Sequence, residues 1–203
     1  MVGFAMTHNE KFAHLGKRLF ITGIPTAGKS YLAQQLASEV NGIAVCLDDF
    51  RSALVVDERY RKWVNFYSDQ DEAAYYAAHG PEERWRDLIA QSEALWPALL
   101  EKISSYQKEK ASVIFESVNL LPHLAHRNLD FPGIVIIGSS YEVVFGRNQK
   151  TPRWGATAEL QELEAREFFY DERPRYKTEA ERYRYPVFET PEDAFLRARG
   201  FLK

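Results

Sequence analysis

Cysteine is almost missing from this sequence, and methionine is scarce. The 203 residues include one cysteine, Cys46, and two methionines. One cysteine excludes a disulfide within the chain, and the Cys-x-x-Cys and Cys-His spacings of structural metal sites are absent from the sequence. Because proteins without disulfides are typical of reducing compartments, the sequence predicts a cytoplasmic protein.

Long hydrophobic runs and internal repeats are missing as well. No apolar run approaches the roughly 20 residues that a membrane helix needs, and residues 1–18 lack the continuous apolar segment of a signal peptide. We therefore expect a protein that is neither membrane-inserted nor exported. The lack of a repeat period argues against a solenoid or a propeller.

Basic residues are not in excess. Lys and Arg number 26 against 29 Asp and Glu, which gives a formal net charge of -3. Non-specific nucleic-acid binding depends on a basic surface that neutralises phosphates, so this balance argues against a nucleic-acid partner. The hydrophobic content of 45% is enough for a substantial core, and the length is that of one domain.

What the sequence does contain is an alternation of apolar runs with helical periodicity. The runs predict strands at residues 18–22, 43–47, 112–115, 133–137 and 185–188. Helical spacing of apolar residues predicts helices within 30–40, 57–109, 157–170 and 193–202. Uninterrupted apolar strands are typical of a parallel sheet covered on both faces. We therefore predict a three-layer α/β/α domain with a five-stranded parallel sheet over residues 17–203, preceded by an N-terminal extension at 1–16.

The segment GIPTAGKS lies between the first predicted strand and the first predicted helix. Its spacing matches GxxxxGK(S/T), in which backbone N–H groups surround phosphate oxygens, the lysine reaches the β- and γ-phosphates and the hydroxyl binds magnesium. The predicted nucleotide-binding residues are Gly23, Ile24, Pro25, Thr26, Ala27, Gly28, Lys29, Ser30 and Tyr31. The motif predicts ATP or GTP with Mg²⁺, the metal bound by Ser30.

Charged and polar side chains follow two other predicted strands. Asp48, Asp49 and Arg51 follow the second strand in a predicted loop, and Glu116 ends the third, with Asn119 close behind. Phosphoryl transfer to a hydroxyl needs a group that takes the proton, for which Asp48 is the first candidate and Asp49 the second. Asp48 is also a candidate magnesium ligand, and Glu116 is a candidate for ordering a magnesium-bound water. All five residues are candidates for binding the acceptor, because arginine pairs with oxyanions and carboxylates accept hydrogen bonds from hydroxyls.

Other classes of phosphate-loop protein match the sequence less well. A GTPase would carry Asn-Lys-x-Asp after a strand, and residues 148–151, NQKT, do not supply it. Residues 130–133, DFPG, precede their strand and so lie at the wrong edge of the sheet for the second GTPase motif. Motor ATPases usually end an apolar strand with an aspartate or an Asp-Glu pair, whereas Phe115-Glu116 supplies one acid.

Taken together, these segments resemble the small-molecule kinases of the adenylate and gluconate kinase group, over most of the chain after residue 18. Residues 115–122, FESVNLLP, are similar to the IEGVHLVP segment of 2-phosphoglycerate kinase, with Ser117 in place of glycine and Asn119 in place of histidine. Residues 47–51, LDDFR, are also similar to the loop of polynucleotide kinases and zeta-toxin-like kinases, whose aspartate takes the proton of the attacking hydroxyl. The resemblance implies the P-loop NTPase fold.

The resemblance also implies a lid and an acceptor-binding region. The basic segment 146–156, predicted as a loop, would be the lid, in which Arg147 stacks on adenine and Arg153 clamps the moving phosphoryl group. Arg166 is a second candidate clamp, and Trp154 is a candidate for closing the lid. Residues 57–110 would form the acceptor-binding region, and one or two of its aromatic side chains are expected to line the pocket. These aromatics are Tyr60, Trp63, Tyr67, Tyr75 and Tyr76.

The sequence therefore predicts an ATP-dependent kinase that phosphorylates a hydroxyl or a phosphate on a small molecule. The predicted catalytic residues are Lys29, Asp48, Arg147 and Arg153. Two alternatives stay open: a kinase acting on nucleotides or polynucleotide ends, and a non-catalytic module that binds nucleotide. The residue pattern does not identify the acceptor.

Overall fold

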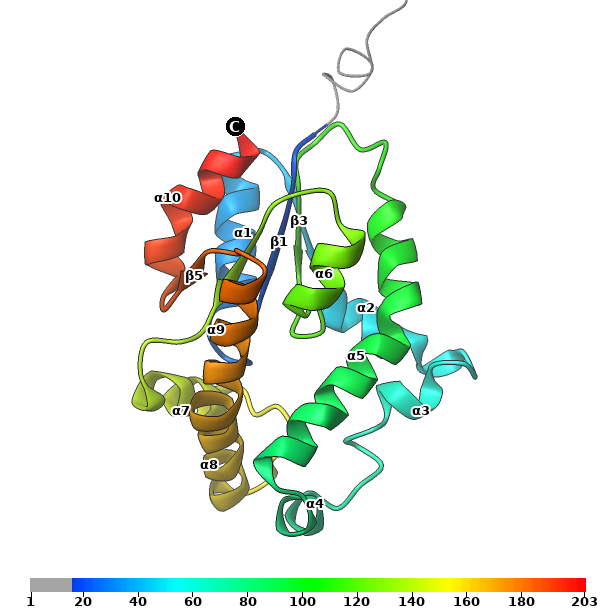
Figure 1. The fold of residues 1–203 in the computed structure, drawn as a ribbon, viewed down its shortest axis with the longest axis vertical. Coiled ribbons are helices and arrows are strands. Elements are labelled where there is room, and N and C mark those ends of the chain that lie inside the picture. Colours follow the sequence, from blue (N-terminus) through cyan, green and yellow to red (C-terminus); the bar gives the residue numbers. More distant parts are fainter. Residues whose placement is uncertain (1–15) are drawn as a thin grey trace, which may run out of the picture.

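The computed structural model describes residues 16–203, and residues 1–15 of the predicted N-terminal extension lie outside the described residues. A five-stranded parallel sheet runs through the centre of the molecule in the order β2-β3-β1-β4-β5, which confirms the predicted sheet (Figure 1). The strands are β1 (Arg18–Gly23), β2 (Ile43–Cys46), β3 (Val113–Glu116), β4 (Gly133–Ile136) and β5 (Val187–Phe188).

The core lies on and around the three central strands. In β1, Phe20 pairs in register with Phe115 of β3, and Ile21 pairs with Ile134 of β4. These side chains are fully buried. Strands β3 and β4 are buried along their whole length because helices cover both faces of the sheet, which is why their sequences lack polar alternation.

Helices form the two outer layers (Figure 1). They are α1 (Lys29–Glu39), α2 (Leu47–Ala53), α3 (Arg61–Val64), α4 (Glu72–Ala78), α5 (Pro81–Ser104), α6 (Pro122–Asn128), α7 (Tyr141–Lys150), α8 (Ala158–Arg166), α9 (Arg173–Arg182) and α10 (Pro191–Leu202). Helices α1 and α10 pack together on one face, while α6 contacts both α5 and α9 on the other. None of the described helices combines the length and the apolar composition needed to cross a membrane.

Local sequence accounts for where the helices begin and end. Helix α1 buries Leu32 and Leu36, one turn apart, and the chain leaves it through Asn41, which has a φ of 49°. Asp71 caps α4 by accepting a hydrogen bond from the backbone N–H of Ala74. The predicted break at residues 80–81 separates α4 from α5.

Two predicted loops are helical in the structure. Residues 48–51 form the first turns of α2, where both aspartates lie next to the positive end of the helix dipole. Residues 146–150 belong to α7, whose N-terminus is capped by Ser140 and which buries Val144 and Asn148 on one face. The irregular part of the predicted lid is therefore confined to residues 151–156.

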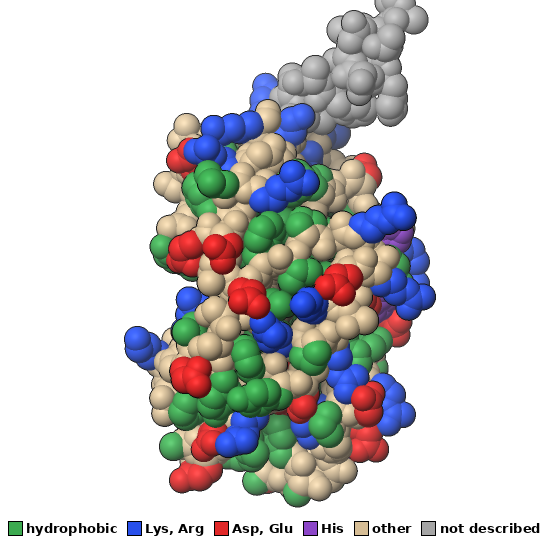
Figure 2. Space-filling model, turned by 60° about the vertical axis from the view of Figure 1, so that its left-hand side comes forward, with side chains coloured by type: hydrophobic (Ala, Val, Ile, Leu, Met, Phe, Trp, Pro, Cys, Tyr) green, Lys and Arg blue, Asp and Glu red, His purple; other side chains and the backbone are tan. Residues whose placement is uncertain are grey.

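Helix α9 is a further difference from the prediction. A π-helix, Glu167–Glu172, joins α8 to α9 in one continuous helical run. Pro174 follows the π-helix directly, in the first turn of α9, and supplies no backbone N–H to the continuous run. Basic and acidic side chains are intermixed over the face that Figure 2 shows, without a continuous basic stripe on that face.

Candidate functional site

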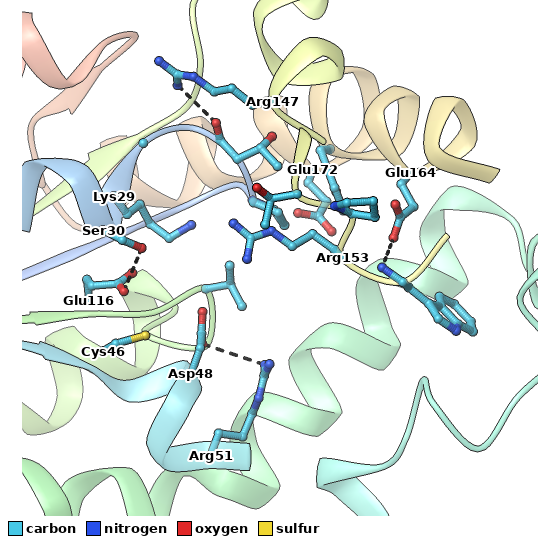
Figure 3. Close-up of a pocket in the computed structure, with 18 of the residues that line it drawn as sticks. Lys29, Ser30, Cys46, Asp48, Arg51, Glu116, Arg147, Arg153, Glu164 and Glu172 are labelled. Atoms are coloured by element: carbon cyan, nitrogen blue, oxygen red, sulfur yellow. Dashed lines mark hydrogen bonds and ion pairs between the residues drawn. The ribbon is translucent and has the colours of Figure 1, made fainter. Parts of the chain in front are cut away.

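A cavity of ≈ 1240 Å³ opens at the carboxyl ends of β1, β2 and β3. In open parallel sheets this edge is the usual place for a ligand. Pockets for one small molecule commonly have volumes of roughly 300 to 1,000 Å³, so this cavity has room for a nucleotide and a second molecule. Figure 3 shows the side chains that point into it.

The segment Gly23–Ser30 turns sharply between β1 and α1. Gly23 has a φ of 126° and Gly28 a φ of 102°, in the left-handed region that favours glycine. A Cβ at Gly23 would lie 1.9 Å from the carbonyl oxygen of Ile136. The first turn of α1 holds no acidic residue and its cap provides no side-chain acceptor, so its N–H groups are available for phosphate oxygens.

Lys29 lies inside this turn and is only 6% exposed. Its ammonium donates a hydrogen bond to the carbonyl oxygen of Ile24 (2.8 Å). Burial lowers the pKa of Lys29, whereas the nearby Glu116 and Asp48 act to raise it. A phosphate group placed beside this ammonium would favour its charged form in the same way.

Ser30 and Glu116 bring two oxygen ligands together at the start of α1. The Ser30 hydroxyl donates to Oε1 of Glu116 (2.9 Å), which ends β3 and is 2% exposed. Within residues 16–203 there is no group of three or more His, Cys, Asp or Glu side chains that could hold a metal. Nucleotide-bound Mg²⁺ keeps several waters and needs only one or two protein oxygens, so the Ser30–Glu116 pair fits that ion.

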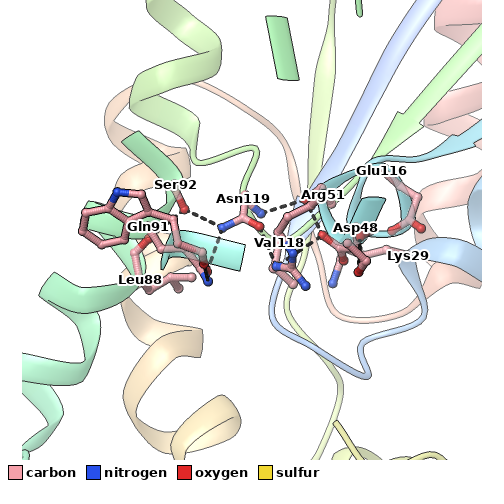
Figure 4. A network of polar contacts seen from close by, with 12 residues as sticks. Lys29, Asp48, Arg51, Leu88, Gln91, Ser92, Glu116, Val118 and Asn119 are labelled. Carbon is pink, nitrogen blue, oxygen red and sulfur yellow. Dashed lines mark hydrogen bonds and ion pairs between the residues drawn. The ribbon is translucent and has the colours of Figure 1, made fainter. Parts of the chain in front are cut away.

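Asp48 and Arg51 face the cavity from α2. Oδ1 of Asp48 accepts a hydrogen bond from the Ser117 hydroxyl (2.6 Å) and lies 3.8 Å from Nη1 of Arg51. The same Nη1 donates to Oδ1 of Asn119 (2.7 Å) (Figure 4). Asp49 also lines the cavity, but it is exposed. Of the two candidate bases, Asp48 is the one whose carboxylate is held in place by these contacts.

Asn119 lies behind Arg51, although the sequence predicts that it contacts the acceptor. Asn119 is fully buried and does not line the cavity. Its Nδ2 donates to Oγ of Ser92 (2.8 Å) and its backbone N–H to Oγ of Ser117 (2.9 Å). Asn119 therefore connects α5 with the two residues that face the cavity, Asp48 and Arg51.

The predicted lid residues divide into two groups. Arg147 donates to the carbonyl oxygen of Thr26 (3.1 Å), and both Arg153 and Trp154 line the cavity. Arg153 points toward Lys29 and Asp48 (Figure 3). Arg166 does not join them: it lies outside the cavity lining, its side chain is 58% exposed, and it pairs with Glu162.

The half of the cavity away from the phosphate loop is aromatic and acidic. Of the five candidate aromatics, Tyr67, Tyr75 and Tyr76 line it, whereas Tyr60 and Trp63 do not. Sequence reasoning missed four glutamates of the lining, of which Glu192 lies in the first turn of α10 and three belong to the continuous helical run from α8 to α9. Those three are Glu164, Glu167 and Glu172. Glu164 and Glu167 are three residues apart, on one side of the helix that the sequence predicts at 157–170. Glu172 lies beyond that predicted helix, in the π-helix that continues it.

Cys46 lies in the cavity wall next to Glu116. Partial burial, with help from the Glu116 carboxylate, raises the pKa of its thiol to about 12. The thiol therefore stays protonated at neutral pH, and a protonated thiol is a poor nucleophile.

Comparison with known proteins identifies the fold. No protein-family model and no curated protein matches the sequence. Among solved structures, shikimate kinase from Acinetobacter baumannii in complex with shikimate is similar, with a TM-score of 0.54, 14% identity and 93% of each chain covered. Shikimate kinase from Bacteroides thetaiotaomicron has a TM-score of 0.52 and 13% identity over 92% of this chain and 98% of its own. A gluconokinase from Sinorhizobium meliloti 1021 aligns with a TM-score of 0.43, 15% identity and 93% of each chain covered.

The five-stranded parallel sheet and the similarity to the two shikimate kinases show that the chain has the α/β fold of P-loop NTPases, as the sequence predicts. The similarity of residues 115–122 to 2-phosphoglycerate kinase has no counterpart in these comparisons and stays a prediction. The roles of the individual site residues likewise remain predictions, and those residues that line the cavity meet there as predicted roles at one site require.

Proposed function

We propose that this protein is an ATP-dependent kinase that transfers the γ-phosphoryl group to a hydroxyl, or to an existing phosphate, on a small molecule. One observation carries the proposal. The phosphate loop and the Asp48–Arg51 pair reach the same cavity from β1 and β2, and Glu116 reaches it from β3 between them. The similar solved structures include a kinase in complex with its small-molecule ligand, which agrees with this assignment.

The residues of this chain divide the work of transfer to a hydroxyl. Backbone N–H groups of Gly23–Ser30 and the Lys29 ammonium bind the phosphates, and Ser30 with Glu116 would hold Mg²⁺, which would neutralise phosphate charge when bound. Asp48 takes the proton of the acceptor hydroxyl. The acceptor oxygen forms a bond to the γ-phosphorus while the bond from that phosphorus to the β–γ bridging oxygen breaks, and ADP leaves with the bond's electrons. Arg153 balances the charge on the transferred group.

The test is to incubate the protein with ATP labelled on the γ-phosphate, Mg²⁺ and a pooled metabolite library. We expect label on one compound with the wild type. Asp48→Asn should lower kcat by about 10²- to 10⁴-fold without weakening ATP binding, because general-base catalysis is worth that much. Asp49→Asn is the matched control and should keep most of the activity.

Two results would contradict the proposal. ATP bound tightly but never transferred would favour the non-catalytic module. Label found only on nucleotides or oligonucleotide ends would favour the nucleotide or polynucleotide kinase. Separately, an Asp48→Asn protein with wild-type turnover would exclude Asp48 as the base.

A further inference from the structure

The half of the cavity beyond Asp48 has a lining of its own. We call it the aromatic arm, defined by Tyr67, Tyr75, Tyr76 and Trp154. The ring centroid of Trp154 lies 5.5 Å from that of Tyr67, 5.6 Å from that of Tyr75 and 6.3 Å from that of Tyr76. The arm is therefore bounded by aromatic side chains from segments far apart in the sequence.

Two of the glutamates beside the aromatic arm already have partners. Glu164 accepts hydrogen bonds from Nδ2 of Asn148 (2.8 Å) and from the backbone N–H of Trp154 (2.7 Å). Glu167 accepts from Nε of Arg84 (2.9 Å) and from the Tyr76 hydroxyl (2.6 Å). Glu164 thus positions the lid segment and Glu167 positions α4. The oxygens of both carboxylates already accept hydrogen bonds.

Glu172 differs from them. Its Oε2 is buried and has no hydrogen-bond partner within the described part of the chain. Its side chain points into the cavity, whose lining it helps to form (Figure 3). Burial raises its pKa well above the usual value, and the neighbouring Glu167 acts in the same direction. A buried carboxyl group without a partner costs free energy, whether it is ionised or protonated.

The cations near Glu172 interact with other groups or are assigned to them by the proposed function. Lys29 lies in the phosphate loop, where the proposed function assigns it to the nucleotide. Arg84 pairs with Glu167 and Asp171. Arg153 lines the same cavity and forms no ion pair within the described residues, and the proposed function assigns it to the transferred phosphoryl group. The ion pairs formed among residues 16–203 thus leave Glu172 without a counter-ion.

An acceptor group that enters the aromatic arm therefore meets rings and an unpaired carboxyl group. A carboxylate or phosphate on the acceptor would be repelled by the ionised forms of Glu167 and Glu172 and would further disfavour them. A neutral hydroxyl would leave the burial cost of an ionised Glu172 in place, so the carboxyl group would stay protonated, as its raised pKa favours. A protonated amine supplies both the charge and the N–H donors, and aromatic faces also attract it.

Resting on the proposed kinase function, we propose that the acceptor carries a protonated amine, which Glu172 binds in the aromatic arm while the reacting hydroxyl faces Asp48. Glu172 is then the residue that determines the charge class of the acceptor. It takes no part in the transfer of the phosphoryl group, so its effect falls on the binding of one class of substrate.

The experiment compares acceptors that differ in one group. Wild type, Glu172→Gln and the control Glu181→Gln, an exposed glutamate on α9, are given γ-labelled ATP, Mg²⁺ and three pools. One holds amino sugars and amino alcohols such as glucosamine and 2-aminoethanol, one their neutral counterparts such as glucose, and one the acids such as gluconate. Binding of each pool in the presence of ADP and Mg²⁺ is measured separately by ligand-observed NMR.

We expect label and binding in the amine pool. Glu172→Gln should lower kcat/KM for the labelled amine roughly tenfold or more, because a charge-assisted hydrogen bond is lost, and leave ATP binding unchanged. Label confined to the neutral or acidic pool would uphold the kinase and overturn this inference. Absence of amine binding by the wild type would also overturn it. An equal loss of activity on all pools in Glu172→Gln would overturn it too, because Glu172 would then support the lid and not select the acceptor. Amine binding without any transfer would instead count against the kinase.

Discussion

Asn119 is placed to determine where two cavity residues lie without reaching the cavity itself. Its side-chain oxygen accepts from Arg51 and its nitrogen donates to Ser92, so both ends of the amide are engaged. Its backbone N–H contacts Ser117, which in turn holds Asp48. Buried polar networks in which every hydrogen bond is made are rigid. The hydrogen bonds of Asn119 therefore fix the distance between Asp48 and Arg51.

Asn119→Ala should therefore change both stability and activity. Loss of the amide removes the hydrogen bonds that Asn119 makes with Ser92 and Arg51 in a buried setting, and we expect unfolding to become easier by about 1 to 3 kcal/mol. Urea unfolding measures this, with Gln107→Ala, an exposed amide, as the control. KM for the acceptor should rise while KM for ATP stays constant. Unchanged stability together with an unchanged acceptor KM would show that the network does not position Arg51.

The site can be predicted from sequence only where its geometry is local. The phosphate loop places Lys29 and Ser30 by spacing alone, and the ends of adjacent parallel strands bring Asp48 and Glu116 to the same edge. Asn119 is assigned to the acceptor by sequence reasoning because its partners, on α5 and α2, cannot be inferred from a one-dimensional pattern.

At the scale of elements, the sequence predicts strands better than helices. Residues 113–116 and 133–136 are wholly apolar or buried because both faces are covered, and that pattern is visible in the sequence. Helix α9 buries only Tyr176 and Ala180, too few positions to show a period. The strand order depends on which crossovers the chain makes, and the sequence carries no signal for it.

The turn after β1 depends on its first glycine. Gly23→Ala forces a side chain to within 1.9 Å of the Ile136 carbonyl oxygen at an unfavourable φ, so the strand or the loop must shift. We expect a loss of at least roughly 1 to 3 kcal/mol in urea unfolding. Gly200→Ala is the matched control, since a Cβ there meets nothing within 4 Å in α10, and it should be neutral or stabilising by up to about 1 kcal/mol. Equal effects of the two substitutions would contradict the tight turn.

Helix α4 carries a buried acid that makes stability depend on pH. Burial, with Glu164, Asp71 and Glu167 nearby, raises the pKa of Glu72 from 4.5 to about 7. The folded protein then holds a proton between these values that the unfolded chain has lost, so this group's contribution falls as pH rises toward about 7.

Glu72→Gln should accordingly stabilise the protein more at about pH 8 than at about pH 5. Urea midpoints at both values give the difference, and Glu93→Gln, an exposed acid on α5, controls for the loss of charge. A gain that is the same at both pH values would argue against a raised pKa.

At the scale of the whole molecule, the cavity joins the ends of three strands to the lid, so ligand binding should stabilise the entire domain. A nucleotide at about 100 times its Kd contributes about 2.7 kcal/mol, which for a protein of this size raises Tm by roughly 5 to 10 °C. Thermal unfolding with and without ATP and Mg²⁺ tests this. Lys29→Met should remove most of the shift, and a wild type that shows no shift with any nucleotide would contradict the phosphate-binding role of the loop.

The single thiol of the chain has a practical consequence. Because Cys46 stays protonated in the cavity wall, maleimide dyes should react with it slowly at neutral pH. A cysteine introduced at an exposed position of the lid segment, such as Thr151, would then be labelled selectively without removing the native one. The fluorescence of a dye at this position would show in real time whether residues 151–156 move when nucleotide binds.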